Sequence, residues 1–172
     1  ARDYEEAVAL YEKYGGHTLG IISDVSFRRN GAKDSLAGIH LSQWLRKCDP
    51  HLPIIIESSE SSNAAEAEAL GAVFIDKNSK KLPVDLGDAI MGNFGFGDFV
   101  IKDPDTGKEI MRLSTLKDLQ KHVFEIPAKS LYYHASSNDI SRWLYSRAMF
   151  PIAEVMKMHR FCSLDEADAV RQ

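Results

Sequence analysis

Three short apolar runs alternate with segments of helical periodicity along the first half of the chain. The runs occupy residues 19–24, 52–56 and 72–75. Apolar runs of about four to eight residues, rich in β-branched side chains, are typical of strands that are fully buried in a parallel sheet. Helical spacing or helix-start and helix-stop signals occur at residues 2–14, 36–47, 64–70 and 83–91. Because the connections are short, the alternation predicts an α/β fold with one parallel sheet and right-handed crossovers.

Two local signals refine this prediction. Residues 25–35 are polar and contain Asn30-Gly31, so they are expected to form a loop between the first strand and the helix that follows. Asn63 precedes Glu66 by three residues, a spacing that predicts a capping box at the start of the 64–70 helix.

The pattern changes after Gly92. Residues 93–97 form a glycine and aromatic linker, and residues 98–113 combine two apolar stretches with a central loop that contains Pro and Gly, which predicts a β-hairpin. The sequence therefore divides into a parallel α/β domain at 1–92 and a small α+β extension at 93–172, in which helices follow the hairpin.

Within the extension, one helix is expected to end before Pro127 and a last helical stretch to follow later. Ser114 is a candidate cap for a helix over 115–124. The last helical stretch begins near Ser137 or Asn138 and is kinked or restarted at Pro151. Three aromatic residues near the boundary are expected to pack between the two parts: Phe94, Phe96 and Phe99.

Charge and composition exclude several classes of protein. The net charge of −4 and the pI of about 5.9 give no electrostatic signature of nucleic-acid binding. No apolar run approaches the roughly 20 residues that a membrane-spanning helix needs, and the charged first residues do not resemble a signal peptide. Cys48 and Cys162 lie outside any metal or disulfide pattern, which favours a reducing, cytoplasmic location. The start at Ala1, without a methionine and inside a helical pattern, suggests a piece of a longer protein.

A polar residue follows or ends each of the three apolar runs. These residues are Asp24, Ser58 and Lys77. Because the carboxyl ends of parallel strands meet at the edge of the sheet where ligands bind, the three side chains are expected to lie together. A carboxylate can act as a nucleophile toward phosphorus, while a hydroxyl and an ammonium group can stabilise the transferred phosphoryl oxygens. The pattern therefore predicts a phosphoryl site.

These residues resemble the receiver domain of response regulators. The matched stretch covers most of residues 1–92, including Leu-Pro-Ile-Ile-Ile-Glu-Ser at 52–58 and Ala-Leu-Gly-Ala-Val-Phe-Ile-Asp-Lys at 69–77. The resemblance implies a flavodoxin-like parallel sheet. It implies the following roles: Asp24 as phosphoacceptor, Ser58 as switch hydroxyl, Lys77 as phosphate-sensing lysine and Phe74 as switch aromatic.

The chain also departs from the receiver pattern. Receivers begin with a strand that supplies two acidic ligands to Mg²⁺, and no counterpart precedes Ala1, so residues 1–92 are expected to lack the first strand, first helix and second strand. Mg²⁺ is expected for the complete receiver. In this fragment only Asp24 and the backbone carbonyl of Ser26 are placed to contribute, so none is expected to bind. Further departures are Asn78 in the usual place of a proline and a longer loop with Arg28, Arg29 and Lys33.

The second part resembles the front end of large bacterial proteins related to phosphoenolpyruvate synthase and pyruvate phosphate dikinase. The resemblance is carried by residues 95–99, 130–134 and 138–144. It implies that a phosphotransferase domain follows in the parent protein, while no catalytic activity is expected of residues 1–172 themselves.

The remaining polar candidates are assigned structural roles. None of the histidines has the spacing of a metal site, and His134 is expected to be a structural or surface residue. Arg142 and Arg147 flank Trp143 and are expected on a salt-bridged outer face of a helix.

The sequence thus predicts a signalling domain that is phosphorylated on Asp24 and controls a fused or associated output domain in a two-component pathway or phosphorelay. The expected partners are a histidine kinase or a small phosphodonor, with no nucleic acid and no membrane, and a homodimer is left open. Two alternatives also stand: the regulatory piece of a phosphoenolpyruvate synthase-like ATP-dependent phosphotransferase, and a degenerate receiver that serves only as an interaction module.

Overall fold

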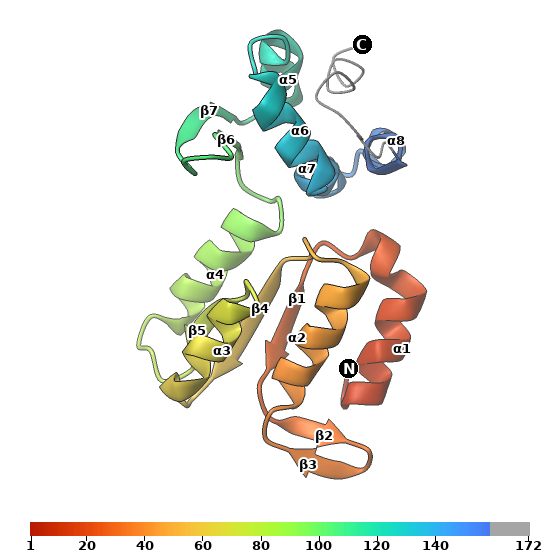
Figure 1. The fold of residues 1–172 in the computed structure, drawn as a ribbon, viewed down its shortest axis with the longest axis vertical. Coiled ribbons are helices and arrows are strands. Elements are labelled where there is room, and N and C mark those ends of the chain that lie inside the picture. The colour runs from red at the N-terminus through yellow and green to blue at the C-terminus, as the bar shows by residue number, and fades with distance from the viewer. Residues whose placement is uncertain (159–172) are drawn as a thin grey trace. The chain divides into compact units, whose positions relative to one another are not determined.

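The computed structural model describes residues 1–158, which divide into two compact units after Asn93 (Figure 1). Unit 1 comprises Ala1–Asn93 and unit 2 begins at Phe94. Each unit has its own core, so the two are described separately.

Unit 1 alternates helices and strands. Its elements are α1 (Tyr4–Tyr14), the 3₁₀ turn η1 (Gly15–His17), β1 (Ile21–Asp24), β2 (Phe27–Arg29), β3 (Ala32–Asp34), α2 (Ala37–Cys48), β4 (Ile54–Ser58), the 3₁₀ turn η2 (Ser61–Asn63), α3 (Ala64–Ala69), β5 (Val73–Asp76) and α4 (Leu82–Asn93).

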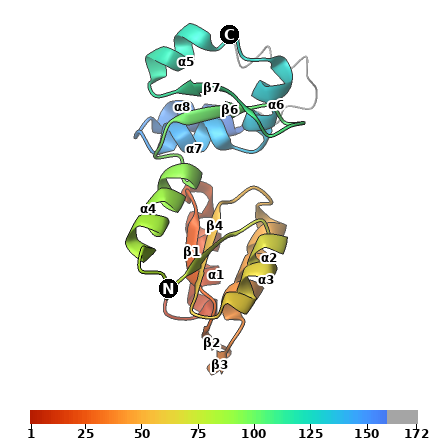
Figure 2. The same ribbon diagram turned by 90° about the vertical axis from the view of Figure 1, so that its left-hand side faces the viewer.

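A three-stranded parallel sheet organises unit 1, in the order β1-β4-β5. Figure 2 shows α2 and α3 on one face of this sheet and α4 on the other. The central strand β4 is the most buried, since Ile54, Ile55 and Ile56 are all at most 2% exposed. Its continuous apolar run is the pattern expected for a strand covered on both faces. The predicted mixed α/β architecture with a parallel sheet is confirmed.

The first strand differs from the prediction of full burial. β1 is an edge strand that pairs with β4 alone, and Ile22 is 43% exposed while Ser23 is buried. An apolar run indicates that a strand is suited to burial, but the strand is fully buried only when other elements cover it on both edges and both faces. The expectation of a fully buried first strand is therefore wrong for the described residues.

The segment expected to be a polar loop forms a second, antiparallel hairpin. β2 and β3 pair with Phe27 opposite Asp34 and Arg29 opposite Ala32. The turn residues Asn30 and Gly31 have φ values of 52° and 77°. Positive φ at both central residues is what a two-residue type I′ turn requires, and Asn-Gly is the pair that adopts it most readily. The sequence contained this turn signal, but the hairpin was not predicted because each of its strands is only three residues long.

Unit 2 combines a hairpin with helices. The described elements are β6 (Phe99–Lys102), β7 (Glu109–Leu113), α5 (Leu116–His122), α6 (Ala128–Ser136), α7 (Asp139–Tyr145) and α8 (Phe150–Met158). The antiparallel pairing of β6 with β7 confirms the predicted hairpin. Its core includes Ile101, Leu131 and Trp143, each at most 1% exposed.

Two helix predictions for unit 2 need correction. The cap of α5 is Thr115 rather than Ser114: the Thr115 side chain accepts from the Asp118 backbone N–H, and the Asp118 carboxylate accepts from the Thr115 backbone N–H. Helix α6, which begins directly after Pro127, was not predicted. Its buried face contributes Leu131 and Ala135 to the core, so tertiary packing stabilises a short helix with weak sequence signals.

Polar side chains join the hairpin, the linker and the helices of unit 2. His134 is buried: its Nδ1 donates to Asp139 and its Nε2 accepts from the Lys102 N–H, which fixes a structural role. Arg142 is only 8% exposed and pairs with Asp139, so the predicted outer face is wrong for this residue. Arg147 stacks on Trp143 and donates to two carbonyls of the 93–97 linker.

Two further sequence expectations concern the cysteines and the membrane. Cys48 is an exposed free thiol, and Cys162 lies outside the described residues. Among residues 1–158, no helix combines the length and the apolar character that crossing a bilayer would take.

Candidate functional site

The candidate site lies at the carboxyl edge of the parallel sheet, where β1 ends at Asp24. The Asp24 side chain is 47% exposed, whereas the backbone that follows it is firmly held. The Val25 N–H donates to Glu57 O of β4 at 3.2 Å, and Val25 O accepts from the Gly38 N–H at 2.9 Å. Asp24 is therefore a solvent-accessible carboxylate on a fixed main chain.

Lys77 connects the ends of all three strands. Its Nζ donates to Asp24 Oδ2 at 2.5 Å, and its backbone N–H donates to Ser58 O at 2.9 Å. The residue directly follows β5, and 53 positions separate it from Asp24 in the sequence. The structure thus brings Lys77 to Asp24 directly, and to Ser58 through the main chain.

Ser58 is buried, and its hydroxyl oxygen already accepts two hydrogen bonds. The Glu60 N–H donates to it at 3.0 Å and the Asn63 side-chain amide donates at 2.9 Å. Its own O–H proton remains available for donation. In the register of the sheet, Asp24 lies opposite Glu57, so Ser58 is one position farther along β4.

Asn63 has a different role from the predicted one. It precedes α3 but its side chain makes no capping hydrogen bond, so the expected capping box is wrong. The side chain instead holds the Ser58 hydroxyl. The 3₁₀ turn over Ser61–Asn63 gives Asn63 helical backbone angles, which do not suit the extended conformation usual for a helix cap.

Asn78 joins the two loops beside the site. Its side-chain amide donates to Ser59 O at 2.8 Å, and its backbone N–H donates to Asp76 Oδ1 at 2.8 Å. The sequence marks Asn78 only as a departure from the receiver pattern, and this contact could not be derived from it.

Gly38 contributes to the site although no role was predicted for it from the sequence. It lies in the first turn of α2, and a Cβ atom at this position would lie 2.1 Å from Asp24 O. Only a residue without a side chain allows α2 to approach the end of β1 this closely. Gly38 therefore sets the position of α2 relative to the Asp24 backbone.

The other two predicted site residues lie near the centre but make weaker contacts. The Ser26 N–H lies 3.4 Å from Asp24 Oδ1, at the long limit for a hydrogen bond, and its hydroxyl is buried without a partner in the structure. Phe74 lies in β5 opposite Ile56 and is half-buried against the core.

A separate polar cluster supports the entrance to α2. Asp34 accepts from the Leu36 N–H and from His40 Nδ1, both at 2.9 Å. The backbone hydrogen bond from Leu36, followed by the interaction with His40, lowers the pKa of Asp34 below its usual value of 3.8. This cluster fixes the base of the β2–β3 hairpin.

The described residues do not supply the ligand set that Mg²⁺ prefers. Mg²⁺ takes near-octahedral oxygen ligands, whereas Asp24 is the one carboxylate here that the sequence assigned to the metal, and Lys77 already bonds to it. Within residues 1–158, no three histidine, cysteine, aspartate or glutamate side chains are grouped to hold a metal ion.

Comparisons with protein-family models, with curated proteins and with solved structures found no match for this chain. The receiver resemblance and the phosphoenolpyruvate synthase resemblance therefore stay predictions. The geometry by itself describes an exposed carboxylate and an ammonium group in contact, with a buried hydroxyl on the neighbouring strand.

Proposed function

We propose that unit 1 is a receiver-like phosphoacceptor module with a flavodoxin-like sheet, in which Asp24 accepts a phosphoryl group. One observation carries this proposal: the 2.5 Å contact between Lys77 Nζ and Asp24 Oδ2 at the carboxyl edge of a parallel sheet. An exposed carboxylate can be reached by a phosphodonor, and a lysine held beside it can neutralise the oxygens of an incoming phosphoryl group.

The reaction is a displacement at phosphorus. An Asp24 carboxylate oxygen attacks the phosphorus of a phosphohistidine or of a small acyl phosphate. The bond from phosphorus to the donor nitrogen or oxygen breaks, and the leaving group keeps the electron pair. The product on the protein is an acyl phosphate, and the Lys77 ammonium group shifts from the carboxylate oxygen to a phosphoryl oxygen.

The consequence is a rearrangement at the ends of β4 and β5. Phosphorylation introduces a group with about −1.5 to −2 charges. Because Lys77 contacts Asp24 through its side chain and Ser58 through its main chain, its movement is coupled to the end of β4. The Ser58 proton can then be donated to the phosphoryl group, and Phe74 on β5 repacks.

The partners follow from this chemistry. The donor is a histidine kinase or a small acyl phosphate, and the output is a fused or associated domain that binds the face of β5 and α4. A link to phosphoenolpyruvate synthase-like proteins stays a prediction from the sequence.

The test is phosphorylation of the chain by acetyl phosphate, with and without Mg²⁺, read by intact-protein mass spectrometry. We expect one added phosphoryl group that hydroxylamine removes, since hydroxylamine cleaves acyl phosphates. Asp24→Asn should abolish the addition. Asp88→Asn is the matched control, because Asp88 is an exposed aspartate inside α4, and it should leave the addition unchanged.

Two outcomes would overturn the assignment. One is equal phosphorylation of the wild-type chain and Asp24→Asn. The other is an absence of phosphorylation in the wild-type chain with and without Mg²⁺, which would favour a degenerate receiver that acts only as an interaction module.

A further inference from the structure

Ser58 has one hydrogen-bonding function that the described residues leave unused. Its hydroxyl oxygen accepts from the Glu60 N–H at 3.0 Å and from the Asn63 side-chain amide at 2.9 Å. A serine hydroxyl has two acceptor lone pairs and one donor proton, so both acceptor positions are filled. Among residues 1–158, no group accepts the Ser58 O–H proton. Because Ser58 is only 5% exposed, a buried donor is left without a partner.

The two donors determine what this hydroxyl can still bind. With both lone pairs occupied, Ser58 cannot accept another hydrogen bond and can only donate one. Buried donors in proteins are normally paired, and the strongest pairing for an O–H group is with an ionised acceptor. A phosphoryl oxygen on Asp24 is an acceptor of this kind. In the register of the sheet, Ser58 lies one position beyond the residue opposite Asp24.

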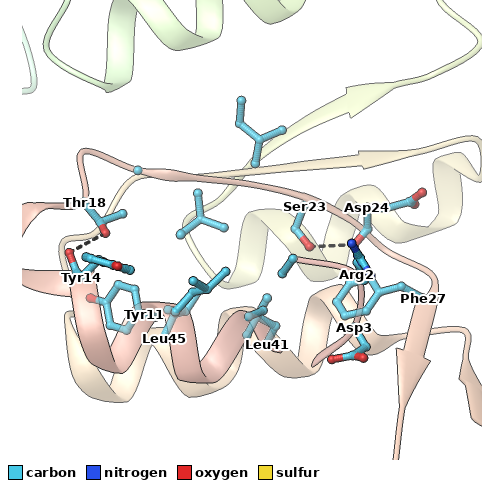
Figure 3. Close-up of a pocket in the computed structure, with 16 residues that line it drawn as sticks. Arg2, Asp3, Tyr11, Tyr14, Thr18, Ser23, Asp24, Phe27, Leu41 and Leu45 are labelled. Atoms are coloured by element: carbon cyan, nitrogen blue, oxygen red, sulfur yellow. Dashed lines mark hydrogen bonds between the residues drawn. The ribbon is translucent and has the colours of Figure 1, made fainter. Parts of the chain in front are cut away.

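The Asp24 carboxylate lies at the same edge of the sheet as Ser58. Figure 3 shows the Asp24 side chain at the end of β1, directed away from the side chain of Ser23. Lys77 connects the two strand ends, since its Nζ donates to Asp24 and its backbone N–H donates to Ser58 O. A phosphoryl group on Asp24 would therefore arrive where β1 and β4 both end.

Asn63 bonds Ser58 instead of capping helix α3. An asparagine directly before a helix usually accepts from a backbone N–H of the first turn. The Asn63 side chain makes no such bond, and its φ and ψ of −75° and −10° are helical. The residue is buried, and its amide reaches back five positions to the Ser58 hydroxyl. Natural proteins break a local sequence rule in this way mainly at functional sites.

We propose that Asn63 is a positioning residue that holds Ser58 as a hydrogen-bond donor toward a phosphoryl group on Asp24. The inference rests on the proposed phosphoacceptor function, and Asn63 acts through Ser58 rather than on the phosphoryl group itself. The amide is essential, because its NH₂ group donates to the Ser58 oxygen. A carboxylate at this position could only accept, so it would draw the Ser58 proton toward α3 and away from Asp24.

Asn63→Asp tests this reversal with almost no change in side-chain size. The 172-residue chain and its variants are treated with acetyl phosphate, and intact-protein mass spectrometry gives the initial rate of phosphoryl addition. Loss of one hydrogen bond to a charged group should lower this rate about tenfold in Asn63→Asp and in Ser58→Ala. Ala65→Asp is the matched control, because it adds the same charge at an exposed position in the first turn of α3, and it should react like the wild-type chain.

A double variant separates positioning from a structural role. If Asn63 acts through Ser58, adding Asn63→Asp to Ser58→Ala should cause no further loss, because the hydroxyl that it reorients is gone. A purely structural role predicts that the two losses multiply. Asn63→Ala keeps the test decisive if the buried carboxylate prevents folding. It should lower the rate in the wild-type background and have no effect in the Ser58→Ala background.

NMR tests the hydrogen bond itself without phosphorylation. The side-chain amide protons of Asn63 should exchange slowly with solvent in the wild-type chain and faster in Ser58→Ala, which removes their acceptor. Equal exchange in the two chains would show that the amide does not donate to Ser58, and would overturn the proposal.

The outcomes also distinguish this proposal from the function on which it rests. A wild-type chain that acetyl phosphate does not label overturns the phosphoacceptor function, and the role of Asn63 with it. A labelled wild-type chain with an equally fast Asn63→Asp overturns the role of Asn63 alone. So does a loss in Asn63→Asp that persists undiminished in the Ser58→Ala background.

Discussion

Gly38→Ala tests the closest approach in unit 1, that of α2 to the end of β1. The added Cβ would lie 2.1 Å from Asp24 O, 3.0 Å from Asp24 C and 3.0 Å from the Val25 Cα. All three are main-chain atoms of a strand end that is hydrogen-bonded to β4. No side-chain rotation can relieve the overlap, so α2 or the strand end has to move by more than about 1 Å to reach ordinary contact distances.

The free-energy cost can be assembled from this geometry. Overpacking of this kind costs about 1–3 kcal/mol. Moving α2 also strains the 2.9 Å hydrogen bond from the Gly38 N–H to Val25 O, worth about 1 kcal/mol. The better helix propensity of alanine offsets at most about 1 kcal/mol. The hydrogen-bond and propensity contributions roughly cancel, so we expect a net destabilisation of unit 1 by about 1–3 kcal/mol.

Gly87→Ala is the matched control. Gly87 also lies inside a helix, α4, but a Cβ there would have no neighbour within 4 Å. The same substitution should therefore stabilise unit 1 by about 0.5–1 kcal/mol through helix propensity alone. The free energies of unfolding of the two variants should therefore differ by about 1.5–4 kcal/mol, and the two substitutions should shift stability in opposite directions.

The assay is urea-dependent hydrogen exchange followed by peptide mass spectrometry, because it reports unit 1 separately from unit 2. Peptides from β1, β4 and α2 give the free energy of unfolding of unit 1. The reasoning is refuted if Gly38→Ala is as stable as the wild-type chain, or if the two alanine variants shift stability in the same direction.

Two further predictions concern ionised side chains. The pKa of Asp34 is lowered, first by the Leu36 N–H, so its contribution to stability is present above about pH 4 and is lost as the pH falls through the lowered pKa. Urea midpoints of the wild-type chain and Asp34→Asn should therefore differ near neutral pH and converge once the pH has fallen through the lowered pKa of Asp34; parallel curves would contradict this. Arg147→Lys should destabilise unit 2 by about 1–3 kcal/mol, because lysine cannot donate to two linker carbonyls while stacking on Trp143 at 4.0 Å. Hydrogen exchange in β6 and α7 measures this loss, and an unchanged exchange rate would contradict it.

The parallel sheet could be predicted from the sequence because its signals are local. Each strand is a short apolar run, each helix has its own start and stop residues, and the connections allow few topologies. The same reasoning predicted a loop around Asn30-Gly31 instead of a hairpin, because three-residue strands are too short to show a recognisable alternation of apolar and polar residues. It also missed α6, whose stability comes from packing against the hairpin rather than from its own sequence.

The centre of the candidate site could be predicted for a different reason. Asp24 and Lys77 are far apart in the sequence, but both end parallel strands, so topology alone brings them to the same edge. No comparable topological rule predicts the residues that support them. Asn63 bonds Ser58 because a 3₁₀ turn changes the direction of its side chain, and the role of Gly38 depends on a contact of main-chain atoms. Tertiary distances of this kind are not encoded in periodicity.

The exposure of Ile22 is the point where sequence and structure disagree most, and the disagreement is itself informative. Locally consistent sequences place apolar runs where they are buried, and departures from this consistency concentrate at functional sites. β1 has the sequence of an interior strand and the position of an edge strand. Helix α1 is covered only in part, since Ala7 and Tyr11 pack against the core of unit 1 whereas Leu10 and Tyr14 are 42% and 49% exposed. Within residues 1–158, the apolar character of β1 therefore exceeds what its position in the sheet buries, because the sequence sets the composition of a strand while its neighbours set its exposure.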